Sequence, residues 1–331
     1  MSRRDRLPIT IRPVEPCDAE AVLSLLSASL GWSVDDAFRQ YLRWKHTGSP
    51  LGPSPAWVAV HEGSVVGYRA VLRWELESSR GAIRAARAVD VATLPSAQGR
   101  GVFSALTTHA VEVLRAEGTE VIFTTPNVQA GAGWIKAGAT MIGRLPVMVR
   151  PRSPMALVRM LGSRGAASRW PVPTTVGSSA SVTMTDPRLH DLLSRLPGPA
   201  GWRTHRTAQL LHWRYGFEPL GYRTLAVHDD IAQGLAVFRL RQRGRATEAA
   251  LCEVLVPEGD PASARALGRR VARASGADYV ITLGSGQPID RTGAVVLPRQ
   301  GPVLYAMALV PGLTVPDRRH WDLALGDVEL L

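Results

Sequence analysis

The alternation of apolar and polar positions predicts a mixed α/β structure for the first half of the chain. Apolar and β-branched residues in alternation predict strands at 9–14, 57–60, 65–73, 83–93, 121–124 and 141–149, the last of which closes the sheet. Helical spacing predicts helices from Asp18, which can cap the first turn, to about residue 30, up to Trp44, over 103–117 and over 134–137. We therefore expect a central mixed, twisted sheet flanked by helices.

The second half repeats the first in the same order. Trp44 stands six residues before the run Pro-Leu-Gly at 50–52, and Trp213 stands six residues before the same run at 219–221. The run Ala-Val-His recurs at 59–61 and 226–228, and Pro-Val recurs at 146–147 and 302–303. Because the blocks agree in unbroken order, the chain is expected to contain two related domains in tandem.

The length of 331 residues and the composition fit two globular domains. We expect an N-terminal domain over 1–150 and a C-terminal domain over 181–331. Residues 151–180, which are rich in Pro, Gly, Ser and Arg, are expected to link them. Neither a secretory signal nor an apolar run of membrane-spanning length is present, so a cytoplasmic protein is expected. Cys17 and Cys252 match no disulfide framework and no metal-ligand spacing.

Much of the net charge of +11 comes from one segment, 121–185, which has no Asp or Glu. Its positive residues are Lys136, Arg144, Arg150, Arg152, Arg159, Arg164 and Arg169. Either this is a solvated linker, or it faces a polyanion such as cofactor phosphates, an acidic acceptor, nucleic acid or a membrane surface. Aromatic residues are sparse here, so a base-stacking platform is not favoured, and there is no clear nucleic-acid or membrane signal.

The most informative motif is a strand, a glycine-bearing turn and a helix start over residues 89–103. Gly99 and Gly101 let the backbone approach a ligand closely, because they have no Cβ. The N–H groups of the first helical turn point toward that ligand, and the helix dipole favours negative charge there. The motif lacks the Lys-Ser/Thr of a P-loop and the glycine spacing of a dinucleotide fold. It is therefore a candidate pyrophosphate site.

These residues resemble those of a known family. Gln98-Gly99-Arg100-Gly101-Val102 is similar to the Gln/Arg-x-x-Gly-x-Gly/Ala signature of the GNAT N-acetyltransferases. The runs 11–13, 18–22 and 126–138 resemble the opening and the later strand–helix pattern of that family. The resemblance covers about 8–150 directly, and 181–310 only through the internal repeat. It implies two tandem GNAT-like domains, the second of them degenerate.

The resemblance also implies that acetyl-CoA or another acyl-CoA lies between two splayed parallel strands ending near Thr93 and Thr124. The backbone of Val91, Ala92 and Thr93 would then hold the pantetheine arm, and Asn127 would line the channel. The amides that would hold the pyrophosphate are those of Gln98, Gly99, Arg100, Gly101, Val102, Phe103 and Ser104. No metal is implied.

Two residues depart from the family pattern. Phe103 stands where the signature has a small residue. Trp134 stands where many members have a tyrosine that can protonate the leaving thiolate, and an indole does not replace that acid. Trp134 is expected to pack on the cofactor arm or in the core, with solvent or another group as the acid.

An acceptor amine with a pKa of about 10.4 must lose a proton before it attacks, so a base or a water chain is expected. Asp90, on the strand beside the thioester position, is the first candidate, and Glu75 on the preceding strand is the second, acting through water. The alternative for Asp90 is a carboxylate that orders the neighbouring turn. No Ser-His-Asp arrangement or metal cluster is persuasive in the sequence.

The second copy lacks the glycine turn. Glu258-Gly259-Asp260-Pro261 stands where Gln98–Gly101 would be, and two carboxylates repel a pyrophosphate. We therefore expect no CoA site in the C-terminal domain, which would instead shape the acceptor cleft or the domain interface.

The resulting hypothesis is an N-acyltransferase that moves an acyl group from acyl-CoA to a small-molecule or peptide amine by direct attack in a ternary complex. The oligomeric state, monomer or homodimer, stays open. Two alternatives also remain. One is an aminoacyl-tRNA-dependent transferase of tandem GNAT-like build, against which the intact glycine turn argues. The other is a non-catalytic acyl-CoA-binding regulator.

Overall fold

The computed structural model describes residues 6–163, 165–284, 294–297 and 299–329. Its contacts divide the chain into two compact units, neither of them continuous in sequence. The first contains residues through Leu76, Ala82–Gly143 and Val303–Val315, and the second contains Glu77–Gly81, Arg144–Pro302 and the residues from Pro316 on. The predicted division at 150 and 181 differs from this partition, because 144–150 and 303–315 each fall in the other unit.

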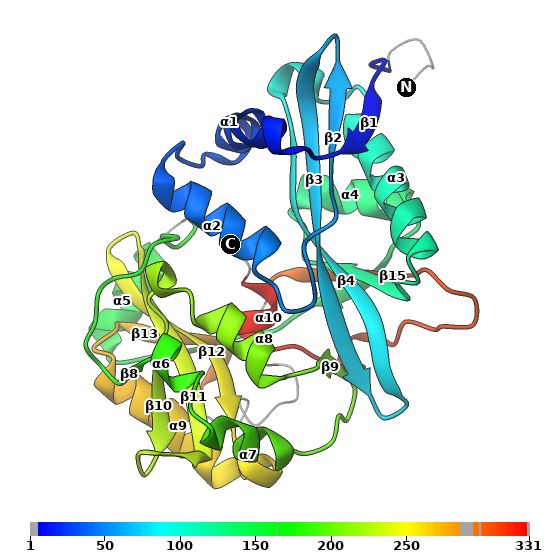
Figure 1. Cartoon of the computed structure of the whole chain (residues 1–331). Helices are drawn as coiled ribbons and strands as arrows, with labels where there is room; N and C mark the ends of the chain where they lie inside the picture. Colours follow the sequence, from blue (N-terminus) through cyan, green and yellow to red (C-terminus); the bar gives the residue numbers. More distant parts are fainter. Residues whose placement is uncertain (1–5, 164, 285–293, 298, 330–331) are drawn as a thin grey trace. The chain divides into compact units, whose positions relative to one another are not determined.

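The first unit is built on one mixed sheet with the strand order β1-β2-β3-β4-β5-β15-β6. Its strands are β1 (Thr10–Pro13), β2 (Ala56–His61), β3 (Ser64–Ser78), β4 (Gly81–Thr93), β5 (Val121–Thr124), β6 (Thr140–Arg144) and β15 (Val303–Ala308). Its helices are α1 (Ala19–Leu30), α2 (Asp36–Thr47), α3 (Val102–Ala116) and α4 (Val128–Lys136). The helices α1 and α2 lie on one face of this sheet and α3 and α4 on the other (Figure 1).

The helix ends follow local rules with one exception. The carboxylate of Asp35 caps α2 by accepting a hydrogen bond from Phe38 N at 2.9 Å, and Gly31 ends α1 in the left-handed conformation. Asp18, expected to cap α1, occupies the N-cap position but makes no capping bond. Its carboxylate accepts two hydrogen bonds from the guanidinium of Arg12 instead, at 2.6 and 2.8 Å.

A glycine sets the position of α3 against the sheet. A Cβ on Gly67 of β3 would lie 2.5 Å from Val102 Cγ1, so only glycine permits the first turn of α3 to pack this closely. The same face is filled by buried apolar side chains, among them Leu106, Ala110 and Ile122. The N-terminus of α3 is therefore held rigidly over β3 and β4.

The second unit repeats this plan with the strand order β14-β7-β13-β12-β11-β10-β8. These strands are β7 (Val147–Pro151), β8 (Ser178–Ser179), β10 (Arg223–Val227), β11 (Asp230–Arg243), β12 (Ala246–Leu255), β13 (Tyr279–Leu283) and β14 (Val295–Leu297). Its helices are α5 (Pro154–Gly162), α6 (Ala180–Thr183), α7 (Arg188–Ser194), α8 (Ala208–Tyr215), α9 (Pro261–Ala274) and α10 (Leu325–Val328). Two short strands, β9 (Trp202–Thr204) and β16 (Trp321–Asp322), pair in parallel. The predicted linker contains α5.

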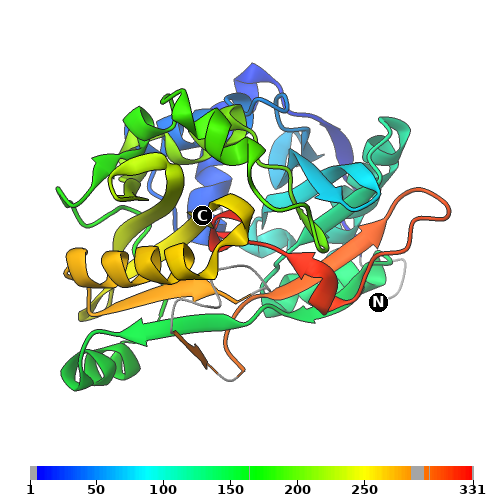
Figure 2. The same cartoon turned by 90° about the horizontal axis from the view of Figure 1, so that it is seen from below.

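The two halves of the chain exchange one strand each. The predicted closing strand 141–149 is in fact two strands, and only β6 stays in the first sheet. The next strand, β7, pairs antiparallel with β13 (Figure 2, green beside orange), with Ile281 opposite Val149. Its counterpart in the repeat, β15, pairs antiparallel with β5, with Ala306 opposite Phe123. The prediction was wrong on this point because a strand pattern does not specify a distant partner.

We expect that the first unit does not fold without β15. All four residues of β5 are buried, and removing β15 leaves this strand with an unpaired edge. A fragment that ends at Gly143 should be unfolded or aggregated by circular dichroism and gel filtration. The same fragment with residues 303–315 attached through a Gly/Ser linker should unfold cooperatively. Equal melting midpoints for the two fragments would contradict this role of β15.

Candidate functional site

The parallel strands β4 and β5 separate part of the way along their length. They pair at three positions, ending with Arg87 opposite Phe123. Beyond this point the Thr124 hydroxyl donates a hydrogen bond to the carbonyl of Ala88 at 3.0 Å, and β5 ends. Since β4 continues to Thr93, its last residues have no partner strand on this side, which is the separation that the sequence analysis expected.

The turn after β4 leads into an uncapped helix. Gly99 and Gly101 have φ angles of +72° and +89°, which L-residues with side chains rarely adopt. Gly101 is the N-cap residue of α3, and no side chain accepts a hydrogen bond from the first turn. A Cβ at Gly99 would meet nothing within 4 Å, so the turn faces open space. The peptide N–H groups at this end are available to an anionic ligand.

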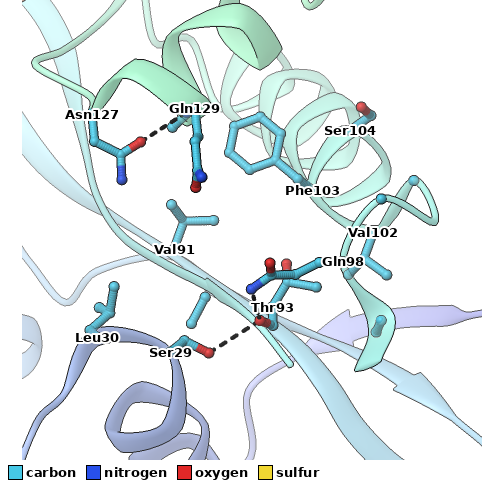
Figure 3. A pocket seen from close by; sticks show the side chains of 15 residues that line it. Ser29, Leu30, Val91, Thr93, Gln98, Val102, Phe103, Ser104, Asn127 and Gln129 are labelled. Atoms are coloured by element: carbon cyan, nitrogen blue, oxygen red, sulfur yellow. Dashed lines mark hydrogen bonds between the residues drawn. The ribbon is translucent and has the colours of Figure 1, made fainter. Parts of the chain in front are cut away.

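A cavity of about 350 Å³ lies where the separated strands meet this turn (Figure 3). Its lining consists of Ser29, Leu30, Val91, Ala92, Thr93, Ala97, Gln98, Gly99, Gly101, Val102, Phe103, Ser104, Asn127, Gln129 and Ala130. The structure thus brings together every residue predicted to bind the cofactor except Arg100 and Trp134. None of the lining side chains is charged, so amides and hydroxyls are the polar groups of this cavity.

Residues from α1 and α4 complete the cavity, and the sequence analysis missed them. The Ser29 hydroxyl and the Gln98 side-chain amide both donate to the carbonyl of Thr93, at 3.1 and 3.2 Å (Figure 3). Asn127 caps α4 by accepting a hydrogen bond from Ala130 N at 2.9 Å. A cap signal at Asn127 was readable in the sequence, but nothing in it joined Ser29 to a strand 64 residues away.

Trp134 belongs to the core and not to the cavity lining. Its side chain is 3% exposed, and the Arg69 guanidinium lies over both its ring and the Phe103 ring, 5.0 Å from each centroid. A Cβ on Gly133 would lie 2.3 Å from the Phe103 ring, so the glycine makes room for the large residue that departs from the signature. Of the two alternatives for Trp134, the structure favours core packing.

Asp90 is buried in an ion pair. Its carboxylate accepts hydrogen bonds from Lys45 Nζ at 2.9 Å and from His46 Nε2 at 2.8 Å. Burial alone raises the pKa of Asp90, but the Lys45 charge and the hydrogen bonds from His46 and Lys45 outweigh it and hold the pKa well below its usual range. Such a carboxylate is a weak base, so this geometry does not support a general-base role for Asp90.

Glu75, the second candidate base, lies on β3 and is half-buried, but it is not part of the cavity lining. Its predicted role therefore also lacks support from this geometry.

The second unit has the same strand separation but a closed helix end. The Thr282 hydroxyl donates to the carbonyl of Leu251 at 3.0 Å, as Thr124 does to Ala88 in the first unit. The N-terminus of α9, however, is capped by Asp260, which accepts hydrogen bonds from Ala262 N and Ser263 N at 3.1 and 2.9 Å. The amides that would receive a phosphate in this copy are already satisfied by a carboxylate.

Two searches of the described residues found nothing. No group of three or more His, Cys, Asp or Glu side chains there could hold a metal ion. Among the same residues, no helix is long and apolar enough to cross a membrane.

Comparison with known proteins agrees with this geometry. Residues 10–132 match the family model of the acetyltransferase (GNAT) domain. No curated protein matches the chain by sequence.

Three solved structures share its fold. A GCN5-related N-acetyltransferase from Kribbella flavida has a TM-score of 0.63 at 16% identity, over 92% of this chain and 72% of that one. One from Anabaena variabilis has a TM-score of 0.65 at 14% identity, over 92% and 73%. A tandem GNAT protein from the clavulanic acid biosynthesis pathway has a TM-score of 0.52 at 16% identity, over 92% and 100%. Residues 10–132 therefore form a GNAT-family acetyltransferase domain, and the chain has the fold of GNAT proteins, among them one of tandem build.

Proposed function

We propose that this protein is an acyl-CoA-dependent N-acyltransferase, with acetyl-CoA as the first donor to test and a small-molecule or peptide amine as acceptor. One observation carries the proposal: an uncapped helix N-terminus opens onto a cavity between separated parallel strands. A diphosphate joined to an extended arm fits such a site, because each part meets backbone groups that lack a protein partner.

The residues present fit this co-substrate. The glycine turn and the first turn of α3, from Gly99 to Ser104, supply N–H donors and no Cβ at Gly99 or Gly101. The free edge of β4 at Val91–Thr93 supplies donors and acceptors at the spacing of an extended chain. Asn127 lines the opposite side of the cavity, at the start of α4.

The reaction class follows from a thioester held next to an amine. A thioester supplies an activated acyl carbon and a thiolate leaving group. In a ternary complex the amine attacks that carbon directly, because no side chain of the cavity lining is a cysteine or another strong nucleophile. Trp134 is buried in the core and cannot act as the acid, so we infer that solvent protonates the thiolate.

Ser104→Glu should abolish or strongly weaken CoA binding while leaving the fold intact. Ser104 is exposed, lies in the first turn of α3 and lines the cavity. A glutamate there favours the helix dipole by about 0.3–1 kcal/mol but places negative charge where the diphosphate would bind. The dissociation constant for acetyl-CoA, measured by calorimetry, should rise at least about tenfold, which is about 1.4 kcal/mol.

Ala262→Glu is the matched control for this substitution. Ala262 is exposed in the first turn of α9, the equivalent helix of the second unit. This variant should bind acetyl-CoA as the native protein does. Unchanged affinity in Ser104→Glu, or an equal loss in both variants, would show that the α3 turn does not bind the phosphates.

One CoA should bind per chain, because Asp260 occupies the helix end in the second unit. Calorimetric titration with CoA should therefore give a stoichiometry near one. A second site of comparable affinity would contradict the assignment of the second unit as a copy without a cofactor site.

Turnover separates an enzyme from a regulator. A panel of primary amines incubated with acetyl-CoA should release free thiol, measured with a chromogenic disulfide, at a rate proportional to protein. CoA binding without thiol release for every amine would instead favour the non-catalytic acyl-CoA-binding regulator. Transfer from charged tRNA without CoA would favour the aminoacyl-tRNA-dependent alternative.

A further inference from the structure

The buried carboxylate of Asp90 is one end of a hydrogen-bonded chain that reaches a serine. His46 Nε2 lies 2.8 Å from Asp90 Oδ2, and His46 Nδ1 lies 3.0 Å from the hydroxyl oxygen of Ser54. The His46 side chain is 11% exposed, and Ser54 is half-buried in the loop before β2. A serine, a histidine and an aspartate thus stand in the order that moves a proton from a hydroxyl toward a carboxylate.

Lys45 leaves the histidine able to accept a proton. The lysine is fully buried and forms the ion pair with Asp90, so the aspartate is neutralised without a charge on His46. Burial lowers the pKa of His46 below 6.5 more strongly than its contacts with Asp90 raise it. At pH 7 the imidazole is therefore neutral. With Nε2–H donating to Asp90, Nδ1 is the acceptor and the Ser54 hydroxyl is its donor.

The internal repeat separates what this cluster does for the fold from what it can do chemically. Trp44-Lys45-His46 in α2 corresponds to Trp213-Arg214-Tyr215 in α8, and Asp90 in β4 corresponds to Glu253 in β12. The Tyr215 hydroxyl donates to Glu253 at 3.0 Å, so both units hold a helix to a strand through a buried carboxylate.

The difference between the copies lies in what bonds to that carboxylate. Burial raises the pKa of Tyr215 well above its ordinary value, so this phenol keeps its proton. The unit with the open helix end has a titratable histidine at the same place. The histidine is therefore not required for the shared bond, which tyrosine also makes.

The cluster also lies toward the reactive end of the proposed cofactor site. The diphosphate end is the turn at Gly99–Ser104, and the strand gap closes at the bond between Thr124 and Ala88. An arm that runs from that turn along β4 points its thioester toward the closed end. Asp90 lies on β4 between Ala88 and the lining residue Val91.

We propose that Ser54 and His46, held in place by Asp90, form the proton relay that deprotonates the acceptor amine, a role that rests on the proposed acyl transfer. As the C–N bond forms and the C–S bond breaks, the amine proton passes to Ser54 Oγ and the serine proton passes to His46 Nδ1. The imidazolium is stabilised by Asp90 and returns its proton to solvent, and the thiolate takes one from solvent. Ser54 is the catalytic residue, and His46 and Asp90 are positioning residues that act through it.

The groups around His46 determine the expected pH dependence. They are Asp90 from β4, Lys45 from α2 and Ser54, while Tyr68 from β3 faces Asp90 and stays uncharged because burial raises its pKa. The relay works only when the imidazole is neutral. The rate should therefore fall as the pH drops through the His46 pKa, which lies below 6.5.

The test compares variants of His46 and Ser54 in the full chain, with acetyl-CoA and the best amine of the panel. His46→Gln and His46→Tyr, the second of which copies the other unit, should lower kcat about 10²- to 10⁴-fold and remove the acid limb of the pH profile. Ser54→Ala should lower kcat while the His46–Asp90 bond remains. All three should keep the native acetyl-CoA dissociation constant, and His61→Gln is the matched histidine control that keeps the native rate and profile.

The outcomes distinguish the relay from the function. Native thiol release and an unchanged pH profile in His46→Gln or Ser54→Ala would refute the relay and leave the acyltransferase intact. An absence of thiol release in the native protein with every amine would refute both. If the His46 variants do not fold by thermal denaturation, Ser54→Ala decides the question, because Ser54 is not part of the buried ion pair.

Discussion

Every helix start leaves peptide N–H groups that need a partner, and the site in this protein depends on one start that has none inside the chain. α3 begins at Gly101 without a side-chain cap, whereas α9 begins with its N–H groups bound to Asp260. Replacing a cap residue costs about 0.5–2 kcal/mol, so an uncapped end is a local loss of stability. A diphosphate that binds there recovers the missing hydrogen bonds, which gives the cavity its affinity without any charged side chain in its lining.

The two units show how few changes separate a binding copy from a copy that only folds. Both separate their central parallel strands at a threonine that bonds to the opposite carbonyl, Thr124 in one and Thr282 in the other. Both anchor a helix to a strand through a buried carboxylate. The differences are confined to the helix cap and to the residue that bonds to the carboxylate. The site thus occupies a small part of a shared scaffold.

Buried charge is used differently around the site. Asp90 is neutralised by Lys45, so its cost of burial is offset by a direct ion pair. Arg69 is 1% exposed and lies between two aromatic rings, with a hydrogen bond from Nη2 to Thr107 and no partner for Nε. Burial lowers the pKa of Arg69 to about 9. This strain lies directly beneath Phe103, which lines the cavity.

Local chemistry was readable from the residues alone. The glycine turn, the helix after it, the strands that end near Thr93 and Thr124 and the repeat all follow from short-range patterns, because φ preference, capping and periodicity act within a few residues. Most of the cavity lining was predicted for the same reason.

Pairing over long distances was decided only by the folded chain. The exchange of β7 and β15, the approach of Ser29 to Thr93 and the burial of Asp90 against Lys45 and His46 join segments far apart in sequence. Asp90 read as a base because a carboxylate beside a site suggests one, and burial with a lysine made it a weak one. Ser54 and His46 gave no signal, since hydrogen-bond partners of this kind are chosen by packing and not by spacing along the chain.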